Sequence, residues 1–277
     1  MKTRLNICDG NVRILVINWV QTVCLGALAL VMSGCSMTPP KTFTVRAEVP
    51  ENFTVTGTAD YVPGPGESCT GRSGKPFRIG RLHFKPEQPN TAHQVEFKVP
   101  LTDTEHGCPT VLQELTMNIE GQWGKRERDM SLASAGFFIS QEPSALSPAT
   151  STPQAQVFNG QCQWLFRTVG SKRVIRKILQ CRAVGANGEM EKRMIGGRLH
   201  RDQLADSTVK LVLSVAKEEE PYFNRYWIKT AAGWKPCKGN WGRDIEELCI
   251  SPPQFKNFKM PDGRDCTVYP SCTEQEQ

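Results

Sequence analysis

The cysteines restrict the folds open to this chain more than any other residue type. The sequence of 277 residues contains 11 cysteines. Cys8 and Cys24 lie in an N-terminal segment, and Cys35 closes that segment. Eight more are spread over the rest of the chain: Cys69, Cys108, Cys162, Cys181, Cys237, Cys249, Cys266 and Cys272. Eight is an even number, as a fully oxidised disulfide framework requires.

The N-terminal segment has the pattern of a secretory signal. Basic residues precede an uncharged stretch at 14–32, and the small residues Ser33 and Gly34 lead from it to Cys35. A basic region, an apolar region and small residues before a cleavage point are typical of a signal peptide. The alternatives are an ordinary, non-lipoprotein signal or a single membrane anchor, because the apolar stretch is about long enough to span a bilayer. We predict a signal peptide at 1–34.

The four residues Met32-Ser33-Gly34-Cys35 resemble the lipobox of bacterial lipoproteins, in which cleavage precedes the cysteine and lipid is attached to its sulfur. The resemblance implies a mature chain that begins at Cys35 and contacts the membrane through this lipid anchor. In such lipoproteins the next residue influences sorting. Ser36, in place of Asp, implies the periplasmic face of the outer membrane, with the periplasmic face of the inner membrane as the alternative.

A periplasmic location predicts that the eight cysteines form disulfides, because that compartment keeps thiols oxidised. Two strand-like runs flank Gly170-Ser171-Lys172, and a hairpin with Ser171 and Lys172 at its centre places Cys162 directly across from Cys181. Opposed residues have Cβ atoms close enough for a disulfide. The same register sets Trp164 against Leu179. The other expected pairs join sequence neighbours: Cys69 with Cys108, Cys237 with Cys249, and Cys266 with Cys272.

Metal and cofactor binding are not expected from the sequence. It has no Cys-x-x-Cys motif, and its four histidines form no His-x-x-x-His pair. Those spacings are the usual signature of a zinc site. We therefore predict no metal ligands and no cofactor, and interpret the cysteines as disulfide partners.

The strand-like patterns predict a mainly β fold. The run at 53–58 is β-branched, and the run at 93–99 alternates between polar and apolar residues. Between 141 and 157 the chain is rich in Pro, Ser and Thr, which is typical of a linker or exposed loop. We predict two small antiparallel β units, sandwich-like or sheets with short helices, stapled by disulfides. The predicted segments are the signal at 1–34, a tether at 35–50, the β units at 51–140 and 158–250 separated by the linker, and a C-terminal tail at 251–277. Whether the units share one sheet system is left open.

Catalytic motifs are missing from the sequence, so we predict no catalytic residues and a protein that is not an enzyme. There is no Gly-x-Ser-x-Gly, Ser-x-x-Lys or His-Glu-x-x-His motif and no phosphate-binding glycine loop. The acidic run Glu218-Glu219-Glu220 lacks a histidine partner, and we interpret it as a solvated face.

The charge balance gives no support to nucleic-acid binding. The formal net charge of +6 falls by two when the three basic residues and one acidic residue of the signal are removed. This mild excess is too small to indicate a nucleic-acid partner. A basic hairpin with Lys172, Arg173, Arg176 and Lys177 is interpreted as a solvated strand face; contact with anionic lipid or an acidic partner is the alternative.

Aromatic residues gather towards the C-terminal side, and four of them are candidates for contact with a protein partner. Tryptophan and tyrosine in a disulfide-bonded loop supply rigid contact area with a polar group, as interface hot spots do. The alternative is a core role, since Trp227 alternates with Tyr226 and Ile228 and one face must pack inward. The partner-contact candidates are Tyr222, Trp227, Trp234 and Trp241.

Three stretches carry a family resemblance: YVPGPGESC at 61–69, QCQWLFRTVG at 161–170 and EEEPYF at 218–223. With the lipobox, they resemble lipoproteins encoded beside type VI secretion effectors, in particular the immunity proteins of antibacterial phospholipases. The resemblance covers about residues 50–250. It implies a protein without its own chemistry that binds and neutralises a secreted effector or toxin. A structural or assembly lipoprotein of an envelope complex is the alternative, and an envelope-acting enzyme is less expected.

Overall fold

The computed structural model describes residues 39–70, 80–105, 107–142, 155–238, 249 and 253–274. The predicted signal peptide, Cys35 and Trp241 lie outside the described residues, as does most of the predicted linker. No helix among the described residues is long and apolar enough to cross a membrane.

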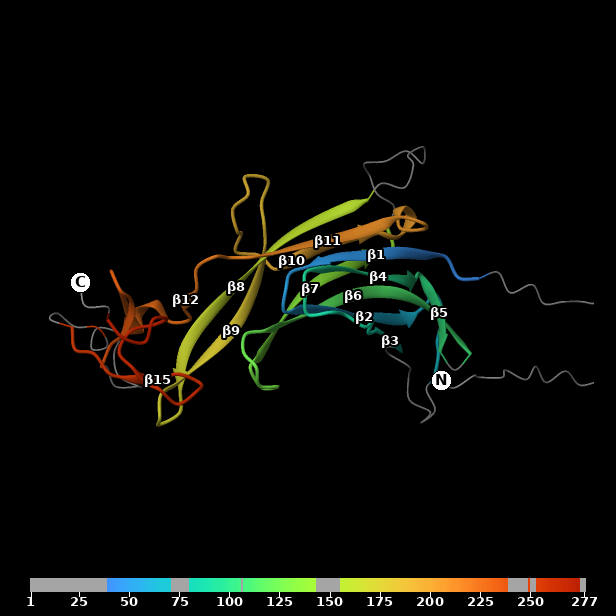
Figure 1. The fold of residues 1–277 in the computed structure, drawn as a ribbon. Helices are drawn as coiled ribbons and strands as arrows, with labels where there is room; N and C mark the ends of the chain where they lie inside the picture. Colours follow the sequence, from blue (N-terminus) through green and yellow to red (C-terminus); the bar gives the residue numbers. More distant parts are fainter. Residues whose placement is uncertain are drawn as a thin grey trace, which may run out of the picture. The chain divides into compact units, whose positions relative to one another are not determined.

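The fold is mainly β, as predicted, and most of its described strands form two sheets (Figure 1). The eight-stranded sheet has the order β16-β15-β9-β8-β11-β1-β4, with β12 also beside β8. Its strands are β1 (Thr42–Val49), β4 (His93–Pro100), β8 (Gln156–Val169), β9 (Val174–Ala183), β11 (Thr208–Val215), β12 (Glu220–Pro221), β15 (Phe258–Lys259) and β16 (Asp265–Cys266).

The six-stranded sheet has the order β10-β7-β6-β2-β3, with β5 also paired to β6. Its strands are β2 (Phe53–Pro63), β3 (Gly80–Phe84), β5 (Thr102–Glu105), β6 (Cys108–Gln122), β7 (Met130–Ser140) and β10 (Ile195–His200). A separate two-stranded sheet contains β13 (Trp227–Thr230) and β14 (Gly233–Pro236). Short 3₁₀ turns are η1 (Arg201–Gln203) and η2 (Asn224–Tyr226).

The main core lies between the two large sheets. Alternate residues of β1 and β2 are buried, as the period of two in a strand dictates. A Cβ atom added to Gly57 of β2 would lie 2.7 Å from the ring of Phe97 in β4, so the facing strands approach closely. The hydroxyl of Tyr61 in β2 donates a hydrogen bond of 2.8 Å to the carbonyl oxygen of Pro100 in β4. Burial raises the pKa of Tyr61, and its hydroxyl therefore stays a donor that links the sheets.

Strands from both predicted β units share both large sheets, which answers the question that the sequence left open. β4 of the first unit lies in the larger sheet with β8, β9 and β11 of the second, and β10 of the second unit pairs with β7 of the first. The pairings β1–β11, β10–β7, β11–β8, β12–β8 and β15–β9 are parallel. Parallel pairing is thus present in addition to the predicted antiparallel pairing. Antiparallel pairing joins β2, β3, β5, β6 and β7 to one another, and also holds in β8–β9, β1–β4, β13–β14 and β15–β16.

The predicted tether at 35–50 is a second correction, because it contains β1. This strand lies between β11 and β4 in the larger sheet. Phe43, Val45, Ala47 and Val49 are all buried in the main core. Their alternation is a strand pattern, and this part of the chain is therefore part of the fold.

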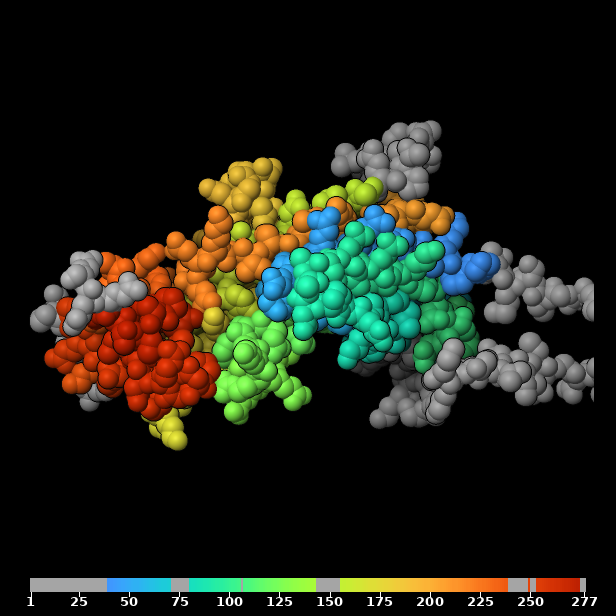
Figure 2. Space-filling model, in the orientation of Figure 1, coloured from blue at the N-terminus to red at the C-terminus, as the bar shows by residue number. Residues whose placement is uncertain are grey.

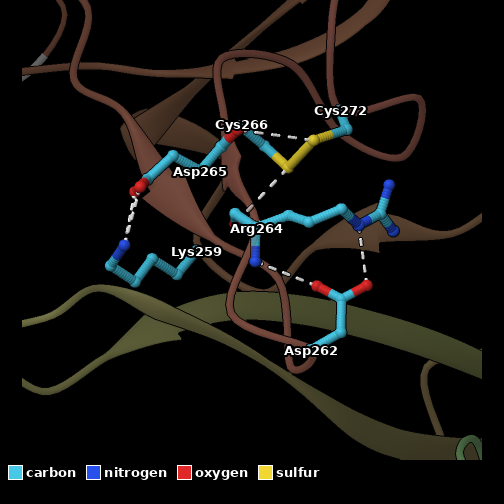
Figure 3. The surroundings of a disulfide bond; sticks show 6 residues. All are labelled: Lys259, Asp262, Arg264, Asp265, Cys266 and Cys272. Carbon is cyan, nitrogen blue, oxygen red and sulfur yellow. Dashed lines mark hydrogen bonds and ion pairs between the residues drawn. A yellow bond between two sulfur atoms is a disulfide. The ribbon is translucent and has the colours of Figure 1, made fainter.

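All four expected disulfides are present: Cys69–Cys108, Cys162–Cys181, Cys237–Cys249 and Cys266–Cys272. The hairpin register is confirmed, since Cys162 faces Cys181 and Trp164 faces Leu179. Cys266 and Cys272 join two parts of the predicted C-terminal tail, which contains β15 and β16. Figure 3 shows this disulfide beside two ion pairs, Lys259–Asp265 and Asp262–Arg264.

The β8–β9 hairpin connects two hydrophobic clusters. Cys162 and Trp164 belong to the main core, whereas Phe166 and Ile175 belong to a second cluster. Figure 1 shows the two yellow strands running from beside β10 and β11 to the region of β15. The hairpin thus provides the base on which the C-terminal segments pack. The second cluster also contains Trp227, Phe258, Cys266, Tyr269 and Cys272.

Candidate functional site

A pocket of about 680 Å³ opens beside the second cluster. Pockets that bind small ligands typically measure about 300–1,000 Å³. Five parts of the chain line it: the turn between β6 and β7, β9, the residues before β12, the β13–β14 hairpin and the C-terminal segment. Figure 2 shows two of these parts, the light-green β6–β7 turn and the red C-terminal segment, next to each other. The lining residues are Trp123, Gly124, Asp129, Ile175, Lys177, Lys217, Glu218, Glu219, Lys229, Gly233, Trp234, Met260, Pro261, Asp262, Tyr269 and Pro270.

The aromatic wall of the pocket is anchored in the second cluster. Phe166 packs against Trp227 at 4.9 Å and against Tyr269 at 4.1 Å between ring centroids. Trp234 is half-buried and lies 6.3 Å from the same ring. Such aromatic pairs add to the energy of burial and restrict the ring orientations. The second cluster therefore fixes the orientation of two aromatic groups of the pocket, Trp234 and Tyr269.

The backbone holds these two aromatic residues side by side. The Trp234 N–H donates to the Tyr269 carbonyl at 2.8 Å, and the Tyr269 N–H donates to the Trp234 carbonyl at 2.9 Å. Gly233, the preceding residue, has φ +131°, which L side chains rarely adopt. A Cβ atom there would lie 2.3 Å from the Tyr269 carbonyl oxygen. Glycine is thus required where β14 meets the C-terminal segment.

Glu219 links three of the segments that form the pocket. Its carboxylate pairs with the ammonium of Lys177 on β9 and accepts a hydrogen bond from the hydroxyl of Tyr269. Burial, then the charge and hydrogen bond of Glu219, raise the pKa of Tyr269. The tyrosine consequently remains a neutral donor. The interpretation of the 218–220 run as a solvated face is wrong for Glu219, because this carboxylate holds the site together.

Asp129 forms a second set of charged contacts in the lining of the pocket. Its side chain is 4% exposed and pairs with Arg126 at 2.7 Å and with Arg176 at 3.4 Å. The hydrogen bonds from Arg126 lower the pKa of Asp129 against the opposing effect of burial. Arg126 also donates to the carbonyl of Pro261 at 3.1 Å. This arginine therefore ties the β6–β7 turn to the C-terminal segment.

Two lysines lie over the tryptophan rings of the lining. Lys177 is 5.9 Å from the ring centroid of Trp123, and Lys229 is 5.6 Å from that of Trp234. Both distances are within the range of a cation–π interaction. Lys229 also pairs with Glu218 at 3.1 Å. Lys217 is exposed, and no acidic side chain in the described part of the chain pairs with it.

The predicted partner-contact residues have different surroundings in the structure. Trp234 lines the pocket, whereas Trp227 is 6% exposed and packs in the second cluster, so the partner-contact prediction for Trp227 is corrected to a core role. Tyr222 is 43% exposed outside the pocket, with the Arg167 guanidinium 5.7 Å from its ring centroid. Trp241 lies outside the described residues.

The basic hairpin is partly neutralised. Arg176 and Lys177 are engaged with Asp129 and Glu219, as described above. Their charges are paired with two carboxylates of the pocket lining, so these two residues do not form a solvated strand face. Lys172, at the tip of the hairpin, is exposed.

The arrangement is suited to binding. Rigid aromatic walls and charged groups at the rim can select a guest by shape and charge. Among the described residues, no group of three or more His, Cys, Asp or Glu side chains is placed to hold a metal ion. Comparisons with protein-family models, curated proteins and solved structures gave no match to this chain.

A Glu219→Gln substitution tests how this carboxylate supports the site. The amide keeps an acceptor for Tyr269 but leaves Lys177, 19% exposed, without its counter-ion. We expect the free energy of unfolding to fall by about 1–2 kcal/mol, measured by urea titration with tryptophan fluorescence. Glu218→Gln is the matched control, because its pair with Lys229 is 77% and 60% exposed and contributes about 0.5 kcal/mol or less. Equal losses in the two variants would contradict the role given to Glu219.

Proposed function

We propose that this protein is a lipid-anchored, periplasm-facing binding protein that neutralises a type VI antibacterial effector, a phospholipase, by binding it. The observation that carries the proposal is the pocket beside the second cluster, with its fixed aromatic walls. Trp234 and Tyr269 are held by mutual backbone hydrogen bonds, and Tyr269 also by the carboxylate of Glu219. A rigid aromatic surface loses little conformational entropy when a partner binds.

Two features of the sequence support the periplasmic setting and the class of partner. The lipobox-like sequence ending at Cys35 provides the anchor, and four disulfides suit an oxidising compartment. The resemblance at 61–69, 161–170 and 218–223 indicates the effector as partner. The last of these stretches includes Glu218 and Glu219 of the pocket lining.

A second candidate, an assembly lipoprotein of an envelope complex, is favoured by a different observation. Leu132 and Phe138 on β7 are 60% and 58% exposed. They share the outward face of this strand, since their positions differ by an even number. A protein partner that covers this face would bury both side chains. A component of a complex would use this face in addition to the pocket.

Co-production with the effector encoded by a neighbouring gene tests the first candidate. The full-length chain is produced in cells whose periplasm receives that effector, and survival and co-purification in mild detergent are measured. We expect protection and a stable complex, and a loss of affinity of at least about tenfold for Trp234→Ala. Met194→Ala is the control, because this side chain is 57% exposed and lies outside the pocket. Neither protection nor co-purification with the wild-type chain would refute the proposed function.

A further inference from the structure

Not every charged side chain in the lining of the pocket has an ion-pair partner. Each of its four carboxylates already has a cation: Glu219 pairs with Lys177, Glu218 with Lys229, Asp129 with Arg126 and Arg176, and Asp262 with Arg264. Within the described part of the chain, Lys217 has no such partner. The lining therefore presents a positive charge that is not neutralised.

The carboxylates of the lining are not available to a guest. The Tyr269 hydroxyl already donates to Glu219, and that carboxylate is further occupied by Lys177. The Lys217 ammonium is thus a donor without an acidic partner among the described residues, while the carboxylates of the pocket are already engaged. A guest that carries an acceptor or a negative charge is complementary to it.

The walls require the rest of the guest to be apolar. Ile175, Met260 and Pro270 complete the lining beside the aromatic residues. Lys177 and Lys229 already lie over the rings of Trp123 and Trp234, so a cationic guest would meet like charges. An apolar body that fills the remaining space is favoured by burial.

We propose that this pocket receives a carboxylate that is attached to an apolar or aromatic group, with Lys217 as the counter-ion of the carboxylate. The inference rests on the proposed function, because it takes the group to be an acidic, apolar protrusion of the protein effector. The carboxylate pairs with the Lys217 ammonium at the rim, and the apolar part lies between Trp234, Met260 and Tyr269.

Titration with a small probe tests the chemistry of the pocket without the effector. N-acetyl-phenylalanine and its neutral amide, N-acetyl-phenylalaninamide, are added to the full-length protein in non-ionic detergent, and tryptophan fluorescence is followed. We expect the carboxylate to bind about fivefold tighter than the amide at low salt, and this preference to shrink as salt screens the charge. Lys217→Gln should abolish the preference. Lys172→Gln, at the exposed hairpin tip, should leave it unchanged.

The outcomes separate this inference from the proposed function. Equal binding of acid and amide, no binding of either, or equal effects of the two lysine substitutions would overturn the inference. If the effector is neutralised but the probe shows no charge preference, the function stands and the pocket chemistry is wrong. If the probe behaves as expected but the effector is not bound, the pocket chemistry stands and the proposed partner is wrong.

Discussion

Replacing Cys162 and Cys181 together by alanine is expected to lower the free energy of unfolding by about 3–5 kcal/mol. The disulfide closes a loop with a sequence separation of 19, and removing it returns that loop's freedom to the unfolded chain. Both sulfur atoms lie in the main core, so the smaller alanine side chains also lose packing. Urea unfolding, followed by tryptophan fluorescence, measures the loss.

The Cys266→Ala, Cys272→Ala variant provides the comparison. Its disulfide spans a sequence separation of only 6, and loop entropy predicts a smaller loss of about 2 kcal/mol. The two variants also differ in the cluster that they weaken. A loss for the Cys162–Cys181 pair no greater than for the shorter pair would show that the hairpin register holds without its disulfide.

Local pairings were predictable from the sequence because their partners are close along the chain. The register of β8 and β9 follows from one turn at Ser171 and Lys172, and this turn places Cys162 opposite Cys181. The Cys237–Cys249 and Cys266–Cys272 disulfides also join close partners, with sequence separations of 12 and 6. Cys69 and Cys108 are 39 residues apart, and only their order among the cysteines indicated this pair. When few residues separate two partners, a turn alone limits the possible pairings.

The parallel pairings could not be predicted in the same way. Thr44 in β1 pairs with Thr208 in β11, and Ile195 in β10 pairs with Ala135 in β7. A period of two shows which face of a strand is buried, but it does not identify the neighbouring strand. For this reason the linker composition suggested two separate units, although the core is built from both.

The candidate site was only partly visible in the sequence for a related reason. Trp234 stood out because it lies in an aromatic stretch beside cysteines. Trp123, Asp129, Glu219 and Tyr269 come from separate segments and meet only through tertiary packing. Glu219, two residues before Pro221, was a usable signal, because a carboxylate close to an aromatic stretch has fewer ways to remain solvated than one in a polar loop.

The backbone contact at Gly233 makes this position the most sensitive point of the pocket. Gly233→Ala is expected to lower the free energy of unfolding by about 3 kcal/mol and to abolish the binding properties of the pocket. The new Cβ would collide with the Tyr269 carbonyl oxygen, which accepts the hydrogen bond from Trp234. Relief of this collision must separate β14 from the C-terminal segment, and the two aromatic walls move apart with them.

Gly263→Ala is the control that isolates the collision from backbone strain. Gly263 also has a positive φ, +96°, but a Cβ atom there meets nothing within 4 Å. Only the conformational cost of about 1 kcal/mol applies, and the pocket should keep its probe binding. Urea titrations and the N-acetyl-phenylalanine titration are carried out on both variants. Similar losses at the two positions would mean that strain alone accounts for the effect, and that the Trp234–Tyr269 contact does not set the geometry of the pocket.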